Sequence, residues 1–143
     1  MLKLSLIAIV AAALAACSPA GPKLSVHDGW SRATGQAESA AAYVTIDNQG
    51  GADKLAGVRS SIGQATLHES NMESGVMRMR PIDPDEGLVV PSNGTLRLAP
   101  AGAHVMIMGL KRPLEAGDRF DLTLLFDKAG PRKVSIAVRP AGA

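Results

Sequence analysis

The sequence predicts an all-β fold, an antiparallel sandwich or small barrel formed by a single domain. From Leu24 onward, short apolar or alternating segments recur about every ten residues, as they do in sandwiches and barrels. The segments between them contain Gly, Pro, Asn and Asp, which favour turns. No stretch shows sustained helical periodicity, and no internal repeat or second domain is evident. The layers of this domain are therefore expected to be sheets.

Five strands are expected in the first half of the domain because each segment is rich in apolar or alternating residues. They are Ser25–Arg32, Ala41–Asn48, Asp53–Ser60, Ala65–Ser70 and Val76–Pro81. The turn sequence "NQGGAD" separates the second strand from the third. The alanine-rich segment "QAESAAAYV" also favours a helical start, although its end, together with the following Thr and Ile, favours a strand.

Five further strands are expected in the second half on the same grounds. They are Gly87–Val90, Thr95–Ala99, His104–Gly109, Arg119–Phe126 and Lys133–Val138. The turn sequences "SNG", "APAGA", "EAGD" and "KAG" lie between them, each with a glycine where a positive φ costs little. Ten strands are too many for one small open sheet, so the sheet is expected to fold back on itself.

The first sixteen residues have the composition of a secretory signal peptide. Lys3 precedes an apolar segment that is too short for a stable membrane span. Leu14-Ala15-Ala16-Cys17 resembles a bacterial lipobox, which predicts cleavage before Cys17 and lipidation of its thiol. The alternative is ordinary cleavage that leaves Cys17 as a free thiol. We expect residues 1–16 to be a signal peptide, 17–23 a tether and 24–140 the folded domain of a membrane-anchored periplasmic lipoprotein.

Charge and cysteine content exclude several classes of function. Cleavage removes one cation, Lys3, so the mature chain is nearly neutral, and no basic stripe predicts binding to nucleic acid. Cys17 is the only cysteine, and a lipid would occupy it. The folded domain therefore has no disulfide, no thiolate zinc site, no cysteine nucleophile and no blue-copper centre.

Methionine and histidine gather in one part of the sequence. Every methionine except Met1 falls between residues 72 and 108, and His68 and His104 flank or enter that segment. Alternation along a strand places His104, Met106 and Met108 on one face, and Met77 and Met79 likewise share a face. Thioethers with neutral imidazoles suit Cu(I) in an N2S2 shell.

The competing explanation is that the methionines are flexible filling of the core, their usual role. Taken alone, each of Met72, Met77 and Met108 fits packing or periphery better than ligation. His27 lies far from the group in the sequence and is interpreted as a surface residue or a strand end. The joint arrangement of histidine and methionine favours a metal site.

The spacing of these residues resembles the signature of the periplasmic copper chaperones called PCu(A)C. His68 is followed by ten residues and Met79, and His104-Val105-Met106 supplies the His-x-Met element. "LHESNMESGVMRMRP", "HVMIMGLKRPLEAGD", "GWSRATG" and "SAAAYVTIDNQG" are similar to the family as well. One difference is the spacer after Met79, which has 24 residues where the family commonly has about 21. The turn "DPDEG" is the expected place of the extra residues.

This resemblance implies a cupredoxin-like Greek-key β-barrel that binds one Cu(I) at an exposed loop-and-strand site. The ligands that it implies are His68, Met79, His104 and Met106. It also implies delivery of the copper to the binuclear copper centre of cytochrome c oxidase. We expect a monomer. We also expect a single copper site, since the chain carries no tail rich in histidine and methionine.

Two other functions remain open from the sequence. One is a structural or partner-binding β-sandwich lipoprotein without metal, whose methionines form an apolar surface. The other, a copper enzyme, is disfavoured because methionine stabilises Cu(II) poorly and no catalytic constellation is visible. Asp83, Asp85 and Glu86 are interpreted as a solvated loop. The expected function is binding and not catalysis.

Overall fold

The computed structural model describes residues 20–143. The signal peptide and the lipidated Cys17 expected from the sequence lie outside the described residues. The described chain forms ten strands: β1 (Leu24–Arg32), β2 (Ser39–Asn48), β3 (Asp53–Ser60), β4 (Gln64–Glu73), β5 (Val76–Pro81), β6 (Leu88–Val90), β7 (Gly94–Arg97), β8 (Ala103–Met108), β9 (Arg119–Phe126) and β10 (Gly130–Arg139).

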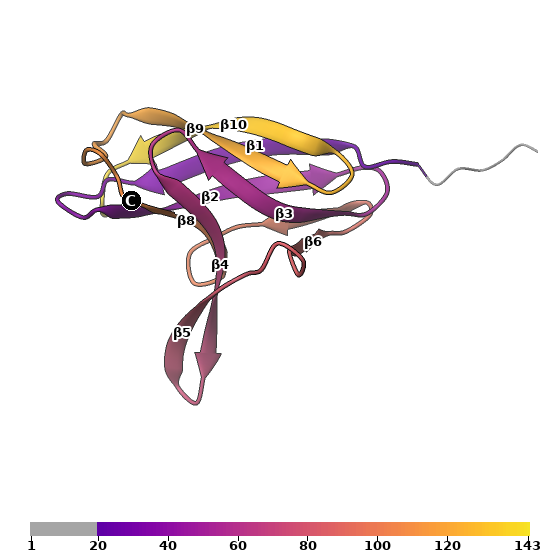
Figure 1. Cartoon of the computed structure of the whole chain (residues 1–143), viewed down its shortest axis with the longest axis horizontal. Coiled ribbons are helices and arrows are strands. Elements are labelled where there is room, and N and C mark those ends of the chain that lie inside the picture. The colour runs from indigo at the N-terminus through magenta and orange to yellow at the C-terminus, as the bar shows by residue number, and fades with distance from the viewer. Residues whose placement is uncertain (1–19) are drawn as a thin grey trace, which may run out of the picture.

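All ten strands join in one mixed sheet that folds back on itself (Figure 1). The strand order is β5-β4-β8-β2-β1-β10-β9-β3-β6, and β7 pairs with β2 beside this path. Only the β1–β10 pair is parallel, with Trp30 opposite Ala137. The end strand β6 contacts β7 and β2, so the curled sheet encloses a core. The predicted all-β fold is confirmed.

No helix occurs within residues 20–143, and therefore none that could span a membrane. The helical start considered for "QAESAAAYV" is wrong. Gly35 has a φ of +59°, and Ala37 donates its N–H to the Thr34 carbonyl at 3.0 Å, which forms a turn. β2 then begins at Ser39, because pairing with β8 and β1 outweighs the helix propensity of its alanines.

The core is built from aliphatic side chains supplied in alternation by the strands. Along β2, Ala40, Ala42, Val44 and Ile46 are all buried. β8 buries Val105 and Ile107, as its alternation predicts. Each fully buried Val or Ile contributes about 1.5–3 kcal/mol relative to exposure, which gives a domain without disulfides its main source of stability.

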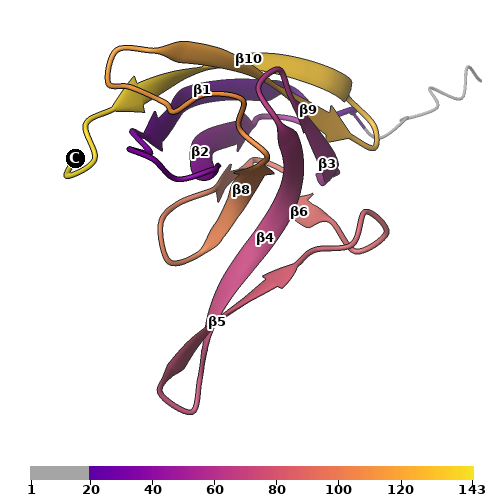
Figure 2. The same ribbon diagram turned by 60° about the vertical axis from the view of Figure 1, so that its left-hand side comes forward.

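The β4–β5 hairpin projects from the rest of the sheet (Figures 1 and 2). Its turn is Ser74-Gly75, with φ of +51° and +80°, the positive values of a two-residue type I′ turn. This tight turn sets the register of Met72 opposite Met77. Every residue of β5 is exposed, so β5 is held mainly by its ladder to β4.

Candidate metal site

Strand register places the histidines and methionines on one face of β5, β4 and β8. His68 of β4 pairs with His104 of β8, and Thr66 pairs with Met106. Since directly opposed residues point to the same side of a sheet, these side chains share a face. Across the hairpin, Ser70 pairs with Met79 and Met72 with Met77. We call this surface the sulfur face; its members are His68, Met72, Met77, Met79, His104, Met106 and Met108.

The two histidines form the centre of the sulfur face. Their ring centroids lie 6.0 Å apart, and the ring planes differ by 21°. A ring nitrogen binds a first-row metal at about 2.0 Å, so two imidazoles on one tetrahedral ion have centroids about 5–6 Å apart. The distance between the His68 and His104 centroids therefore suits a shared ion.

A backbone carbonyl fixes the orientation of His104. The Nδ1 of His104 lies 3.0 Å from the carbonyl oxygen of Gly102. Because a carbonyl only accepts, this Nδ1 carries the hydrogen, and Nε2 keeps its lone pair for a metal. The same carbonyl accepts from the Ser70 N–H at 3.2 Å, which ties the end of β8 to β4.

His104 is 4% exposed, so at this position the site is not exposed as the family resemblance implies. It does share a face with Met106, but the His68 ring lies beside it and the Tyr43 ring lies 6.5 Å from its centroid. Tyr43 itself packs on Trp30, with centroids 4.6 Å apart. Local sequence does not indicate this aromatic support, because Tyr43 is distant in the chain and comes near His104 through the pairing of β2 with β8.

Thr66 is a second residue that sequence reasoning missed. Its Oγ1 lies 3.2 Å from Nδ1 of His68, and both residues are partly buried. A hydroxyl that accepts from Nδ1 leaves Nε2 of His68 free for a metal, as in His104. The i, i+2 spacing of Thr66 and His68 on one strand was the available signal.

The methionines of the sulfur face are outside the core. Met72, Met77, Met79 and Met108 are between 51% and 64% exposed, and Met106 is partly buried. None of the five belongs to the buried hydrophobic cluster. Packing of the core therefore does not account for methionine at these positions.

The opposite face of the hairpin is charged. Arg80 donates to Glu69 at 2.9 Å and to Glu86 at 2.8 Å, and Arg78 pairs with Glu73 at 3.0 Å. The hydrogen bonds from Arg80 lower the pKa of Glu86. On the sulfur face, by contrast, β4, β5 and β8 present no carboxylate. Within residues 20–143 no three His, Cys, Asp or Glu side chains form a metal-binding group.

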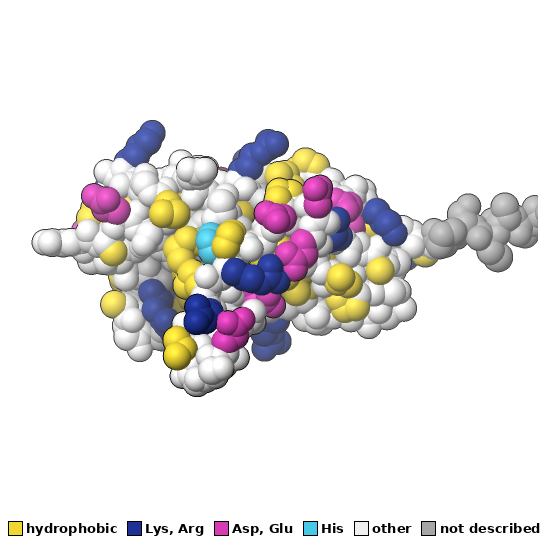
Figure 3. Space-filling model, turned by 60° about the horizontal axis from the view of Figure 1, so that its bottom comes forward, with side chains coloured by type: hydrophobic (Ala, Val, Ile, Leu, Met, Phe, Trp, Pro, Cys, Tyr) yellow, Lys and Arg dark blue, Asp and Glu magenta, His cyan; other side chains and the backbone are white. Residues whose placement is uncertain are grey.

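The structure brings the four sequence-predicted ligands onto one surface carried entirely by strands, without the loop contribution expected from the family. Met106 belongs to the next pair on this face on one side of the histidine pair, and Met79 to the next pair on this face on the other side. Figure 3 shows the face toward which the hairpin projects, with a histidine between hydrophobic side chains. The turn at Asp83–Gly87 lies between β5 and β6, outside the strands that carry these residues.

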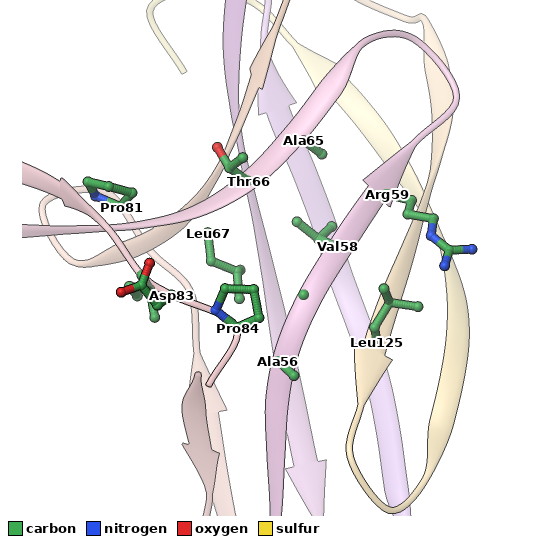
Figure 4. Close-up of a pocket in the computed structure, with 12 residues that line it drawn as sticks. Ala56, Val58, Arg59, Ala65, Thr66, Leu67, Pro81, Asp83, Pro84 and Leu125 are labelled. Carbon is green, nitrogen blue, oxygen red and sulfur yellow. The ribbon is translucent and has the colours of Figure 1, made fainter. Parts of the chain in front are cut away.

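An apolar groove of about 510 Å³ lies beside β4, mainly on the side of Leu67 (Figure 4). Val58, Leu67, Pro84 and Leu125 are among its lining residues, and none of the lining residues is His or Met. Leu67 alternates with His68 along β4, so it points away from the sulfur face. The groove contains none of the proposed ligands, and it borders the candidate metal site only at Thr66 and Pro81.

His27 lies on β1, away from the sulfur face. Its Nε2 is 2.6 Å from Asp47 and its Nδ1 is 2.9 Å from Asp28. These carboxylates, Asp47 above all, raise the pKa of His27. Its interpretation as a surface residue agrees with a side chain that is 42% exposed.

Comparison with known protein families shows to which family this chain belongs. The family model of LpqE-like lipoproteins matches residues 24–138. This chain belongs to that family. Lipoprotein Lxx21020 of Leifsonia xyli subsp. xyli is 35% identical over 116 residues, which cover 80% of this chain and 68% of the relative.

Two solved structures extend the comparison to the fold. The apo PCuAC domain from PmoF1 is 29% identical, with a TM-score of 0.67 over 84% of this chain and 96% of that domain. The solution structure of Cu(I)-DR1885 from Deinococcus radiodurans is 30% identical, with a TM-score of 0.55 over 80% of this chain and 78% of that protein. The resemblance to PCu(A)C proteins and the cupredoxin-like β fold are thereby confirmed.

Proposed function

We propose that this protein is a copper chaperone that binds one Cu(I) through His68, Met79, His104 and Met106. The observation that carries the proposal is the His68–His104 pair, 6.0 Å apart, at the centre of a face that presents thioethers and no carboxylate. The Cu(I) form of DR1885, 30% identical to this chain, supports the choice of metal.

The donor set selects Cu(I) for two reasons. Thioether sulfur and imidazole nitrogen are neutral donors, and sulfur is soft, which matches a monovalent soft cation. Mg²⁺, Ca²⁺ and Mn²⁺ are held in proteins largely by carboxylate oxygens, and β4, β5 and β8 present no carboxylate on this face. Met79 is half-exposed, so its sulfur is accessible to an acceptor that docks on this face. Such a site suits transfer of copper and not catalysis.

Membership in a lipoprotein family supports an extracytoplasmic location. In this proposal residues 1–16 are removed, Cys17 carries the lipid, and residues 17–23 tether the domain 24–140 to the membrane. The acceptor is a copper protein such as the subunit of cytochrome c oxidase that carries the binuclear copper centre. These assignments are independent of the ligand set.

The second candidate function is a partner-binding β-sandwich lipoprotein without metal. The exposure of Met72, Val76, Met77, Met79 and Met108 favours it, since large exposed apolar side chains mark interaction surfaces. This candidate predicts that Leu replaces each Met without loss of function, whereas copper binding requires the sulfur.

Competition with a chromophoric Cu(I) chelator separates the two functions. The test variant is His68→Ala with Met106→Leu, which removes one nitrogen and one sulfur without opening the buried His104 position. The matched control is Met108→Leu, which removes a thioether on the same strand and face, four residues along β8 from His104. We expect the test variant to bind Cu(I) at least about 100-fold more weakly, and the control within about twofold of wild type. Equal affinity of test variant and wild type contradicts the proposed function.

A further inference from the structure

The β4–β5 hairpin carries more thioethers than the proposed site uses. Met72 lies directly opposite Met77, which places their Cβ atoms about 5 Å apart. Met77 and Met79 are two residues apart on β5, with Cα atoms about 7 Å apart on the same face. Methionine has three rotatable side-chain bonds, so the three sulfur atoms can converge on one ion.

Neither the core nor a neighbouring element accounts for these side chains. Met72 is 64% exposed, Met77 51% and Met79 52%, on a hairpin that projects from the body (Figure 2). Side chains that are half-exposed to water keep their rotamer freedom. They can change position when a ligand arrives, at little cost in packing.

The two faces of the hairpin differ in chemistry. The charged groups Glu69, Glu73, Arg78 and Arg80 pair with each other on one face. The other face presents Ser70 and the three thioethers of Met72, Met77 and Met79. A position formed on the second face attracts soft monovalent ions and offers nothing to hard divalent ones.

We propose that Met72, Met77 and Met79 form a second Cu(I) position at the end of the hairpin, through which copper leaves for the acceptor. This inference rests on the proposed function. On the shared face, the pair of Met79 lies between the pair of His68 and the Met72–Met77 pair, so Met79 can belong to both positions. One chain therefore holds one ion at a time, either at the histidines or at the hairpin.

Transfer between the positions is an exchange of neutral ligands. The bonds from copper to His68, His104 and Met106 break while bonds from Met77 and Met72 form, and Met79 remains bound. Copper stays Cu(I) throughout, and no proton or electron is released. The ion then lies on the part of the molecule that projects furthest, where only thioethers hold it.

The first test measures transfer kinetics on the full chain in detergent, from the Cu(I)-loaded protein to an excess of a chromophoric chelator. The variant is Met72→Leu with Met77→Leu, and Met108→Leu is the control. We expect the double variant to lose less than about threefold in Cu(I) affinity but to release copper about tenfold more slowly. The control releases copper at the wild-type rate. Release from the double variant at the wild-type rate overturns the proposal.

The second test uses Ag(I) as a redox-inert soft probe in protein with 13C-labelled methionine methyl groups. In His68→Ala with Met106→Leu, we expect Ag(I) to shift the methyl signals of Met72, Met77 and Met79 but not that of Met108. Unmoved signals of Met72 and Met77 overturn the hairpin position. If wild type itself fails to bind Cu(I), the proposed function fails and the hairpin position fails with it.

Discussion

Replacement of Thr66 by Val tests whether His68 is oriented for a metal. The change removes the Oγ1 that lies 3.2 Å from Nδ1 of His68 and keeps the shape of the side chain. One hydrogen bond between partly buried neutral groups contributes about 1 kcal/mol net. If that bond holds the ring in its binding orientation, its loss weakens Cu(I) binding about fivefold. The expected change in thermal stability is small, since Thr66 does not belong to the buried core.

The assay is chelator competition at fixed pH with three variants. Thr66→Ser keeps the hydroxyl and should bind like wild type. Thr95 lies on β7, away from the sulfur face, and its hydroxyl donates to Asp47 at 2.7 Å. Thr95→Val removes this hydroxyl and should also bind Cu(I) like wild type. If Thr66→Val binds Cu(I) as tightly as wild type, the hydrogen bond does not orient a metal ligand, and this part of the account is refuted.

Three further predictions concern stability. Asn48 is 2% exposed; its amide nitrogen donates to two backbone carbonyls and its amide oxygen accepts from two backbone N–H groups. Asn48→Asp should therefore lower the free energy of unfolding in urea by about 3–5 kcal/mol at pH 7, and by less in acid. An unchanged urea midpoint at pH 7 would contradict this prediction. Ile107→Ala opens a cavity behind the sulfur face and should cost about 3 kcal/mol by the same method, whereas a loss under about 1 kcal/mol would show that the core collapses around it. Because Asp47 raises the pKa of His27 above 6.5, the pair should stabilise the fold fully below pH 6.5 and lose this contribution as the pH rises through the raised value. His27→Gln should therefore reduce the difference in Tm between pH 5.5 and pH 8.5. If the difference is undiminished, groups other than His27 cause the pH dependence of Tm.

Much of the fold was predictable because its turns are marked by glycine and its strands by alternation. Asp53–Ser60, Val76–Pro81 and Arg119–Phe126 were predicted with the bounds that the structure has. β4 was predicted to end at Ser70 but continues to Glu73, because the hairpin ladder with β5 extends strand structure into polar sequence. Local pattern carries no information about that pairing.

The candidate site was predictable in composition and only partly in geometry. Alternation placed His104 and Met106 on one face, and the register of β4 with β8 then brought His68 beside His104. Neither the burial of His104 nor the support from Tyr43 follows from local sequence, since both arise from strands that are distant in the chain. Thr66 was overlooked because its role depends on the orientation of the His68 ring.

Native mass spectrometry of the mature protein with Cu(I) tests the central claim most directly. The proposed ligand set predicts a mass increase of one copper per chain that persists in Met108→Leu and needs at least about 100-fold more free Cu(I) in His68→Ala with Met106→Leu. Because the histidine position and the hairpin position share Met79, no second copper should bind at a modest molar excess of Cu(I). A wild-type protein that acquires no copper, or a double variant that still acquires one with unchanged affinity, would contradict the assignment of the sulfur face as a Cu(I) site.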